Sequence, residues 1–460
     1  MRLNFLFGRT TEYFQFKGKA LPVWNWGYRF IQPPLIIIPF KFYYRKFEIA
    51  GWEHMPTDKP VLLAISHRNA FMDSLALVNT HYTQVWQLAR GDAFNNPVLR
   101  RLFYFFHMLP IWRERDGAGA DTKAENQSTF EACYDILKLN GMVGIYPEGD
   151  CINERHIRSL KKGICRIAFG AMEQFNWDLD LHIVPVGISY SHAPGFRETQ
   201  LIQFGKPILA ADYKHQWDLN QGNAINLLKE DIEASMKKLV VDIPKGHYHH
   251  DIDELAVMMS HRRCGKNGSP LEILNEQRAT VARLQQTISE HPEQMTELVR
   301  ALHPYKRKTR ELQLDEETLD EGKQRKATRW SVALALCLTL PLFLMGWITH
   351  ALPVWLTRTA VKKVVKKDIF ISSIRYAVGM LSLYLYYIIL LLLGILLLPV
   401  AWWAIAGVLA LPFLGVFAWE YQRRIRLFAR VQKVRRLLRL RDTGIMEIYA
   451  HREKIYRLLS

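Results

Sequence analysis

Short apolar runs alternate with longer amphipathic segments between residues 47 and 241, and this alternation predicts an α/β domain. The apolar runs have the length and the continuous hydrophobicity of buried strands. We expect strands at 47–49, 61–65, 85–88, 143–146, 183–189 and 201–204. The segments between them carry apolar residues at helical spacing. We expect helices at 73–79, 97–107, 122–139, 162–174 and 223–241.

The pattern differs on the N-terminal side of this domain. Residues 1–46 are aromatic and basic, and the apolar run at 31–40 contains three prolines. A run of about ten residues is too short to cross a bilayer. Tryptophan and tyrosine beside Lys and Arg favour an interfacial membrane anchor, and a hydrophobic arm packed on the domain is the alternative.

Beyond the α/β domain, which we place at residues 47–250, the chain becomes charged. Residues 251–330 carry an approximate helical stripe of Leu271, Leu274, Val281, Leu284 and Ile288, so we expect a small helical insertion. The HYHHD sequence at 247–251 has ligand-type side chains. Adjacent histidines at a domain exit are more often solvated, and we predict no metal site.

From residue 331 the pattern is that of an integral membrane protein. The stretch between Arg375 and Glu420 is free of charges and broken near Pro399, and it is long enough for a hairpin at 375–419 of two crossings of about 20 residues each. Residues 331–357 are also apolar, but both of their flanks are strongly basic, as is the region after Trp419. The positive-inside rule places all three basic flanks in the cytoplasm. Residues 331–357 are then re-entrant, and a single span is the alternative.

Charge supports a lipid environment. The net charge is +17, and many basic residues lie beside the apolar C-terminal segments, which favours anionic lipids or phosphorylated substrates over nucleic acid. Residues 421–460 predict a basic amphipathic helix at an anionic membrane surface, or else a solvated helix packed on the soluble domain. The five cysteines form no Cys-x-x-Cys pair and fit a reducing compartment.

Candidate chemistry starts at residues 61–74, VLLAISHRNAFMDS. A strand-like run ends at Ser66 and is followed at once by His67, whose side chain is suited to general-base catalysis near neutral pH. Asp73 could orient the imidazole if His67 lies in a loop and Asp73 in the first turn of the next helix. The alternative is a core histidine followed by an aspartate favoured by the helix dipole.

Two later stretches extend this pattern: HMLPIWRERDG at 107–117 and GIYPEGDCINERHIRSLKKG at 144–163. With residues 61–74 and IVPVGI at 183–188, they stand in the order of the four blocks of the glycerol-phosphate and lysophosphatidate acyltransferase family. The chain resembles that family from about residue 46 to residue 244. Two departures stand out. Five residues separate His67 from Asp73 where the common form has four, and Asp150-Cys151 replaces the usual Thr-Arg, with Arg155 and Arg158 as the nearest cations.

The resemblance implies roles for these blocks. His67 is the general base, Asp73 orients it, and Glu148 with the backbone around Gly149 binds the acceptor, although PEG could also be a plain turn. Arg113 is the expected phosphate ligand, because a guanidinium matches phosphate oxygens bidentately. A surface arginine paired with a neighbouring acid is the alternative. Weaker candidates for the phosphate or the acyl donor are Arg68, Arg158 and Lys162.

We therefore expect an acyltransferase domain with a mixed, mostly parallel sheet flanked by helices, followed by a helical membrane region. The expected reaction moves a fatty acyl group from acyl-CoA or acyl carrier protein to glycerol 3-phosphate or lysophosphatidate, without any other cofactor, at the cytoplasmic face of a membrane. A transferase acting on a non-phosphate lyso-lipid or aminolipid is one alternative. A non-catalytic lipid-binding scaffold is the other.

Overall fold

The computed structural model describes residues 12–80, 84–113, 122–323, 329–397 and 399–459. It divides the chain into two compact units. The first contains the described residues up to Asp242 together with Lys366–Ser373, and the second contains Ile243–Val365 and the described residues from Ile374. Contacts end the main part of the first unit at Asp242, and the sequence prediction placed the end of the α/β domain at residue 250.

The first unit is built on a sheet in the order β3-β9-β8-β4-β7-β5-β6, with β10 paired to β8. Its strands are β3 Lys46–Ala50, β4 Val61–Ile65, β5 Val85–Arg90, β6 Met108–Ile111, β7 Met142–Ile145, β8 His182–Tyr190, β9 Thr199–Phe204 and β10 Ile208–Leu209. The pairs are parallel except where β8 meets β9 and β10. The predicted mixed, mostly parallel sheet is confirmed.

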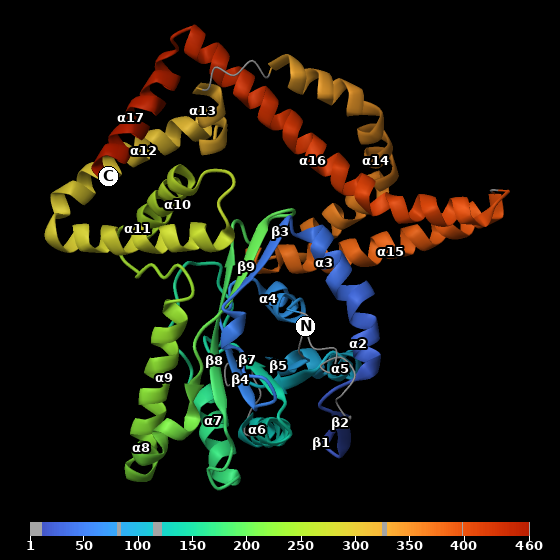
Figure 1. The fold of residues 1–460 in the computed structure, drawn as a ribbon, viewed down its shortest axis with the longest axis vertical. Coiled ribbons are helices and arrows are strands. Elements are labelled where there is room, and N and C mark those ends of the chain that lie inside the picture. The colour runs from blue at the N-terminus through green and yellow to red at the C-terminus, as the bar shows by residue number, and fades with distance from the viewer. Residues whose placement is uncertain (1–11, 81–83, 114–121, 324–328, 398, 460) are drawn as a thin grey trace. The chain divides into compact units, whose positions relative to one another are not determined.

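Helices follow the strands as the amphipathic pattern predicts. They are α4 Ala70–Val78, α5 Pro97–Phe105, α6 Thr122–Lys138, α7 Gly163–Gln174, α8 Lys214–Leu219 and α9 Gln221–Lys237. Leu62 and Ala64 of β4 share one buried core with α6, α7 and α9. Successive side chains of a strand point to opposite faces, and the remaining residues of β4 are buried as well. Strand β4 is therefore covered on both faces, in the middle of the sheet (Figure 1).

The N-terminal region forms a hairpin of β1 Tyr13–Phe16 and β2 Lys19–Pro22, then α2 Trp26–Gln32, a π-helical turn at Pro33–Ile37 and α3 Ile38–Tyr43. Part of it packs on the α/β domain, where Phe14 and Phe16 join the main core. Other apolar side chains stay exposed, including Phe30 and Ile38. The region thus contains both a packed arm and an exposed apolar face, and its location at a membrane stays a prediction.

The second unit is helical. Its soluble part comprises α10 His249–Cys264, α11 Pro270–Glu290, α12 Pro292–Glu311 and α13 Glu316–Lys323. The helix α16 Ala401–Arg439 continues the second crossing candidate into the basic tail, and α17 Thr443–Leu459 follows it. Val431 and Val434, on the apolar face predicted for the tail, are buried, and α16 contacts α13. That part of the tail face covers protein in this structure.

Three helices are long and apolar enough to cross a membrane: α14 Arg329–Val364, α15 Ile371–Leu397 and α16. α14 is one uninterrupted helix that contains Pro341 and Pro353. Its length would allow the single span that was the alternative to a re-entrant segment. The sidedness of all three helices stays a prediction.

Candidate active site

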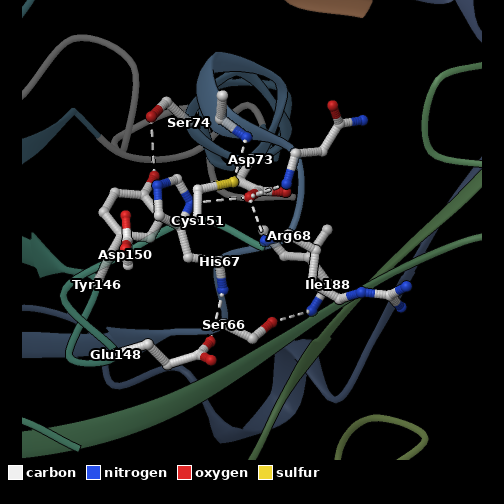
Figure 2. Close-up of polar contacts among 12 residues, drawn as sticks. Ser66, His67, Arg68, Asp73, Ser74, Tyr146, Glu148, Asp150, Cys151 and Ile188 are labelled. Atoms are coloured by element: carbon white, nitrogen blue, oxygen red, sulfur yellow. Dashed lines mark hydrogen bonds and ion pairs between the residues drawn. The ribbon is translucent and has the colours of Figure 1, made fainter. Parts of the chain in front are cut away.

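The centre of the site is a short loop between β4 and α4 that carries His67. Strand β4 ends at Ile65, and α4 begins at Ala70, so that Asp73 lies in its first turn. The imidazole Nδ1 of His67 lies 2.9 Å from Oδ2 of Asp73 (Figure 2). The structure thus brings together the two residues predicted as base and orienting carboxylate.

The carboxylate of Asp73 is fully buried and accepts four hydrogen bonds. Its Oδ2 accepts from the amides of Arg68 and Asn69 at 2.9 and 2.8 Å as well as from His67. Its Oδ1 accepts from the Tyr190 hydroxyl at 2.5 Å. An ionised acceptor on Nδ1 selects the tautomer with the proton on that nitrogen. The lone pair of Nε2 is then available to remove a proton from a substrate hydroxyl.

The imidazole is also held by an aromatic neighbour. The ring centroids of His67 and Tyr146 are 4.3 Å apart, with 34° between the ring planes. The Tyr146 hydroxyl donates to Oε1 of Gln87 at 2.7 Å and lies 2.8 Å from Oγ of Ser74. Burial is the main reason why the pKa of Tyr146 is raised, so this phenol stays neutral. Ring contact and carboxylate together fix the orientation of the base.

Glu148 supports the loop from the neighbouring strand. Its Oε1 accepts from the backbone amide of His67 at 2.9 Å, and its Oε2 accepts from the amide of Arg158 at 3.3 Å. Burial raises the pKa of Glu148, while these two hydrogen bonds and the Arg158 charge act in the opposite direction. Parallel strands β4 and β7 end at the same edge of the sheet, which explains why residues 81 positions apart meet here. This carboxylate links the histidine loop to Arg158, and its predicted contact with the acceptor stays a prediction.

Two arginines converge on the turn that follows Glu148. Nη1 of Arg113 donates to the carbonyl of Gly149 at 3.0 Å and lies 3.6 Å from Oδ1 of Asp150. Arg158 donates through Nη2 to the carbonyl of Asp150, and its Nη1 lies 3.9 Å from Oδ2 of the same residue. Gly149 has a φ of 70°, a conformation that L side chains rarely adopt. The side chain that faces this glycine belongs to Lys161.

The weaker candidates lie around this centre. Arg68 donates its amide to Asp73, and its Nη2 lies 3.4 Å from Oδ1 of Asn153. Lys162 is exposed at the N-terminus of α7, where its neighbour Lys161 is the lysine beside Gly149. The structure therefore gathers His67, Asp73, Glu148, Gly149, Arg113 and Arg158 in one site, and it favours Lys161 over Lys162 there.

Sequence reasoning missed several side chains of the site, notably Tyr190, Tyr146 and Asn69. Cys151 also belongs here, since its Sγ accepts from the amide of Ala70 at 3.0 Å. Burial, together with the charge of Asp73, raises the pKa of the Cys151 thiol to about 12. Among the described residues, ligand atoms of His67, Asp73 and Cys151 form a group close enough to hold a metal ion, which the HYHHD histidines do not. The four hydrogen bonds to Asp73 and the protonated thiol favour an organic base over a metal ligand set.

The amides of the loop bear on oxyanion stabilisation. The backbone N–H groups of residues 67–70 already donate, to Glu148, to Asp73 twice and to Cys151. An oxyanion held by this loop would have to displace one of these acceptors. In the PEG sequence at 147–149, Pro147 has no N–H and the amide of Gly149 also donates already, to the carbonyl of Tyr146 at 3.0 Å.

Part of the chain is similar in sequence to known acyltransferases. Residues 46–189 match the family model described as Acyltransferase. Glycerol-3-phosphate O-acyltransferase 2 of Saccharomyces cerevisiae is 28% identical over 142 residues, which are 31% of this chain and 18% of the relative. Glycerol-3-phosphate O-acyltransferase 1 of the same yeast is 24% identical over 283 residues, 56% of this chain and 36% of the relative. The chain therefore matches about a third or less of the length of these relatives.

A solved structure is also similar in part. The 1-acyl-sn-glycerophosphate acyltransferase of Thermotoga maritima shares 13% sequence identity at a TM-score of 0.30, over 41% of this chain and 71% of that one. The fold itself is defined by the sheet order given above. All four sequence blocks fall inside the residues matched by the family model. Residues 46–189 are therefore an acyltransferase domain, similar in sequence to yeast glycerol-3-phosphate O-acyltransferases.

Proposed function

We propose that the protein is a membrane-bound O-acyltransferase that moves a fatty acyl group from an acyl thioester to a hydroxyl of glycerol 3-phosphate or lysophosphatidate. The observation that carries the proposal is the His67–Asp73 pair, in which a buried carboxylate holds Nδ1 and leaves Nε2 for the substrate. Nε2 removes the proton of the acceptor hydroxyl as its oxygen attacks the thioester carbonyl. The C–O bond forms, the C–S bond breaks, and the imidazolium returns its proton to the leaving thiolate.

The phosphate of the acceptor is proposed to bind where Arg113 and Arg158 converge. Both guanidinium groups are less than one-quarter exposed, and both lie near the turn that Glu148 links to the histidine loop. In such a partly desolvated position, guanidinium contacts to a phosphate are stronger than in water. Asp150 already faces both arginines, so a phosphate has to compete with its carboxylate.

Membrane association is supported by three helices with the length and hydropathy of bilayer spans. We place the active site at the cytoplasmic face, because basic residues flank these helices. The yeast relatives are glycerol-3-phosphate O-acyltransferases by name, which favours glycerol 3-phosphate over lysophosphatidate as the first acceptor to test.

The test uses the full chain purified into lipid nanodiscs, with radiolabelled acyl-CoA or acyl carrier protein as donor. Acceptors are glycerol 3-phosphate, lysophosphatidate and a lyso-aminolipid without a phosphomonoester, and the His67→Ala protein is the blank. We expect donor-dependent product with a phosphorylated acceptor and none with the blank. If product forms with the lyso-aminolipid and with neither phosphorylated acceptor, the proposed class of phosphorylated acceptors is wrong. Thioester-independent lipid binding without turnover would instead support a scaffold.

A further inference from the structure

The segment that joins α14 to α15 belongs to the first unit, which also contains the loop that carries His67. Lys366–Ser373 clusters with the described residues up to Asp242, and the 3-10 turn at Asp368–Phe370 contacts α4. Ser372, in the first turn of α15, is fully buried. Its hydroxyl donates a hydrogen bond to Oδ1 of Asn69 at 2.5 Å. A residue 303 positions away in the sequence therefore reaches the loop that carries His67.

Asn69 occupies a central position in that loop. Its backbone amide donates to Oδ2 of Asp73 at 2.8 Å, and its side-chain Nδ2 donates to the carbonyl of Ala193 at 2.9 Å. The side chain is almost fully buried, so each of its polar atoms requires a protein partner. Ser372 supplies the partner of Oδ1. Without it, the carbonyl oxygen of this amide would be buried without that bond, and the amide would gain freedom to rotate.

The loop depends on such contacts because its backbone is strained. Ala70 has a φ of 38°, which is uncommon for a residue with a Cβ, and Asn69 itself has φ −139° and ψ 48°. Unfavourable backbone conformations persist when surrounding contacts over-determine them. The hydrogen bonds that Asn69 donates to Asp73 and Ala193, and the one that the Ala70 amide donates to Sγ of Cys151, fix the turn between β4 and α4. Loss of one bond is then expected to loosen the turn that holds His67 against Asp73.

We infer that Ser372 is a positioning residue of the transferase reaction, which acts through Asn69 on the orientation of the His67–Asp73 pair. It touches neither base nor carboxylate, and its effect is on the geometry of the loop. The inference rests on the proposed function where it is tested by kcat. Its second test, hydrogen–deuterium exchange of the loop, requires no substrate.

The chain offers a matched control in the next residue. Ser373 is also buried, and its Oγ has no hydrogen-bond partner in the described structure. In nanodiscs, Ser372→Ala is expected to lower kcat about tenfold and to change the KM of donor and acceptor less than twofold. Ser373→Ala is expected to keep the wild-type kcat. Equal kcat values for the two alanine variants, or a change in KM alone, would overturn the inference.

A double-mutant cycle tests whether Ser372 acts on the catalytic loop through Asn69. If Ser372 acts through Asn69, adding Ser372→Ala to Asn69→Ala should cost no further activity. If the two losses multiply, Ser372 acts elsewhere and the inference is wrong. Each variant is first checked for a single peak in size-exclusion chromatography and for cooperative melting, so that the activities of folded proteins are compared.

Hydrogen–deuterium exchange on the same full-length proteins supplies the readout without substrate. Ser372→Ala should speed exchange in peptides that cover residues 66–72, where the amides of Arg68 and Asn69 donate to Asp73. Ser373→Ala should leave this exchange unchanged. If Ser372→Ala speeds exchange but the wild-type protein transfers no acyl group, the positioning contact is supported and the proposed function is refuted. If the wild-type protein is an active transferase but Ser372→Ala leaves exchange unchanged, the proposed function is supported and the positioning contact is refuted.

Discussion

Nδ1 of His67 lies 2.9 Å from Oδ2 of Asp73, although the two residues would point apart if both were part of one helix. They meet because β4 ends two residues before His67 and α4 begins three residues after it. Five residues separate the pair, and within this loop Ala70 has a φ of 38°. The pair therefore has the relationship expected of a base and its orienting acid.

We expect His67→Ala to lower transfer by about 10²- to 10⁴-fold, because general-base catalysis typically contributes that much. Asp73→Asn should cause a comparable or smaller loss, since an amide no longer selects the imidazole tautomer with its lone pair on Nε2. Initial rates of the purified variants in nanodiscs provide the measurement. Wild-type turnover by folded His67→Ala protein would exclude the proposed mechanism.

Arg113→Ala is expected to raise the acceptor KM by about 10- to 100-fold, which corresponds to about 1.4 kcal/mol for each factor of ten. The donor KM should change much less, because the guanidinium is proposed to hold the acceptor phosphate. Arg113→Lys should restore only part of the affinity, since an ammonium retains the charge but not the planar fork.

The matched control for Arg113 is Arg101→Ala, which removes an exposed guanidinium from α5. It should leave both KM values unchanged. An unchanged acceptor KM in Arg113→Ala would point to an acceptor without a phosphate at this position.

The topology of residues 331–357 has two possible outcomes. Strongly basic residues flank the segment on both sides, so the positive-inside rule predicts that both of its ends lie in the cytoplasm. α14, however, is one uninterrupted helix, and its length and hydropathy would allow a single crossing. The expected outcome is the re-entrant arrangement that the basic flanks predict.

Cysteine labelling in sealed vesicles tests this topology. Single cysteines at Lys363, Pro399 and Arg426 are introduced into an active variant whose five native cysteines are replaced by serine. A membrane-impermeant maleimide should label positions 363 and 426 from the same side and position 399 from the other. Labelling of position 363 from the outside, opposite to a further single cysteine placed at Lys323 before α14, would overturn the re-entrant arrangement and leave a single span for α14.

His107 predicts a dependence of stability on pH. It is buried, its two ring nitrogens lack hydrogen-bond partners in the described structure, and its ring stacks on Trp86 at 4.5 Å. Burial lowers the pKa of His107 from 6.5 to about 3. Between these values the unfolded chain binds a proton that the folded protein does not, so stability falls as the pH is lowered through this range. The slope is at most about 1.4 kcal/mol per pH unit.

The measurement is the melting temperature of the first unit, which contains His107, in the full-length protein between about pH 7 and pH 5. His107→Asn, which tolerates the φ of 56° at this position, should lower stability at neutral pH and flatten the dependence on pH. Parallel curves for wild type and variant would contradict this assignment.

Local patterns in the sequence predicted much of the fold. The continuous apolar run of β4 and the helical spacing in α6 and α9 each specify an element, because burial dictates periodicity. Strand β6, which contains Pro110, and the hairpin of β1 and β2 were not among the predicted strands. Both are short, and short strands carry little periodic signal.

Some residues of the site could likewise be predicted from the sequence, and others could not. His67, Asp73 and Arg113 follow apolar runs within ordered blocks, so they could be identified from the sequence. Tyr190 has a weaker signal, as a polar residue at the end of a strand predicted from IVPVGI. Asn69 and Ser372 had none, because a single hydrogen bond across 303 residues leaves no pattern in either segment.

The start of α15 has a consequence for where the product is released. Ser372 lies four residues before Tyr376, the first residue of the charge-free stretch, and a helix rises 1.5 Å per residue. Along this helix, the residue bonded to the catalytic loop is therefore about 6 Å from the apolar stretch. If α15 spans the bilayer, the loop that carries His67 is tethered at the depth of the lipid headgroups. In the proposed reaction, an acyl chain transferred there would pass directly into the hydrocarbon layer, so that diffusion of an insoluble product through water is avoided.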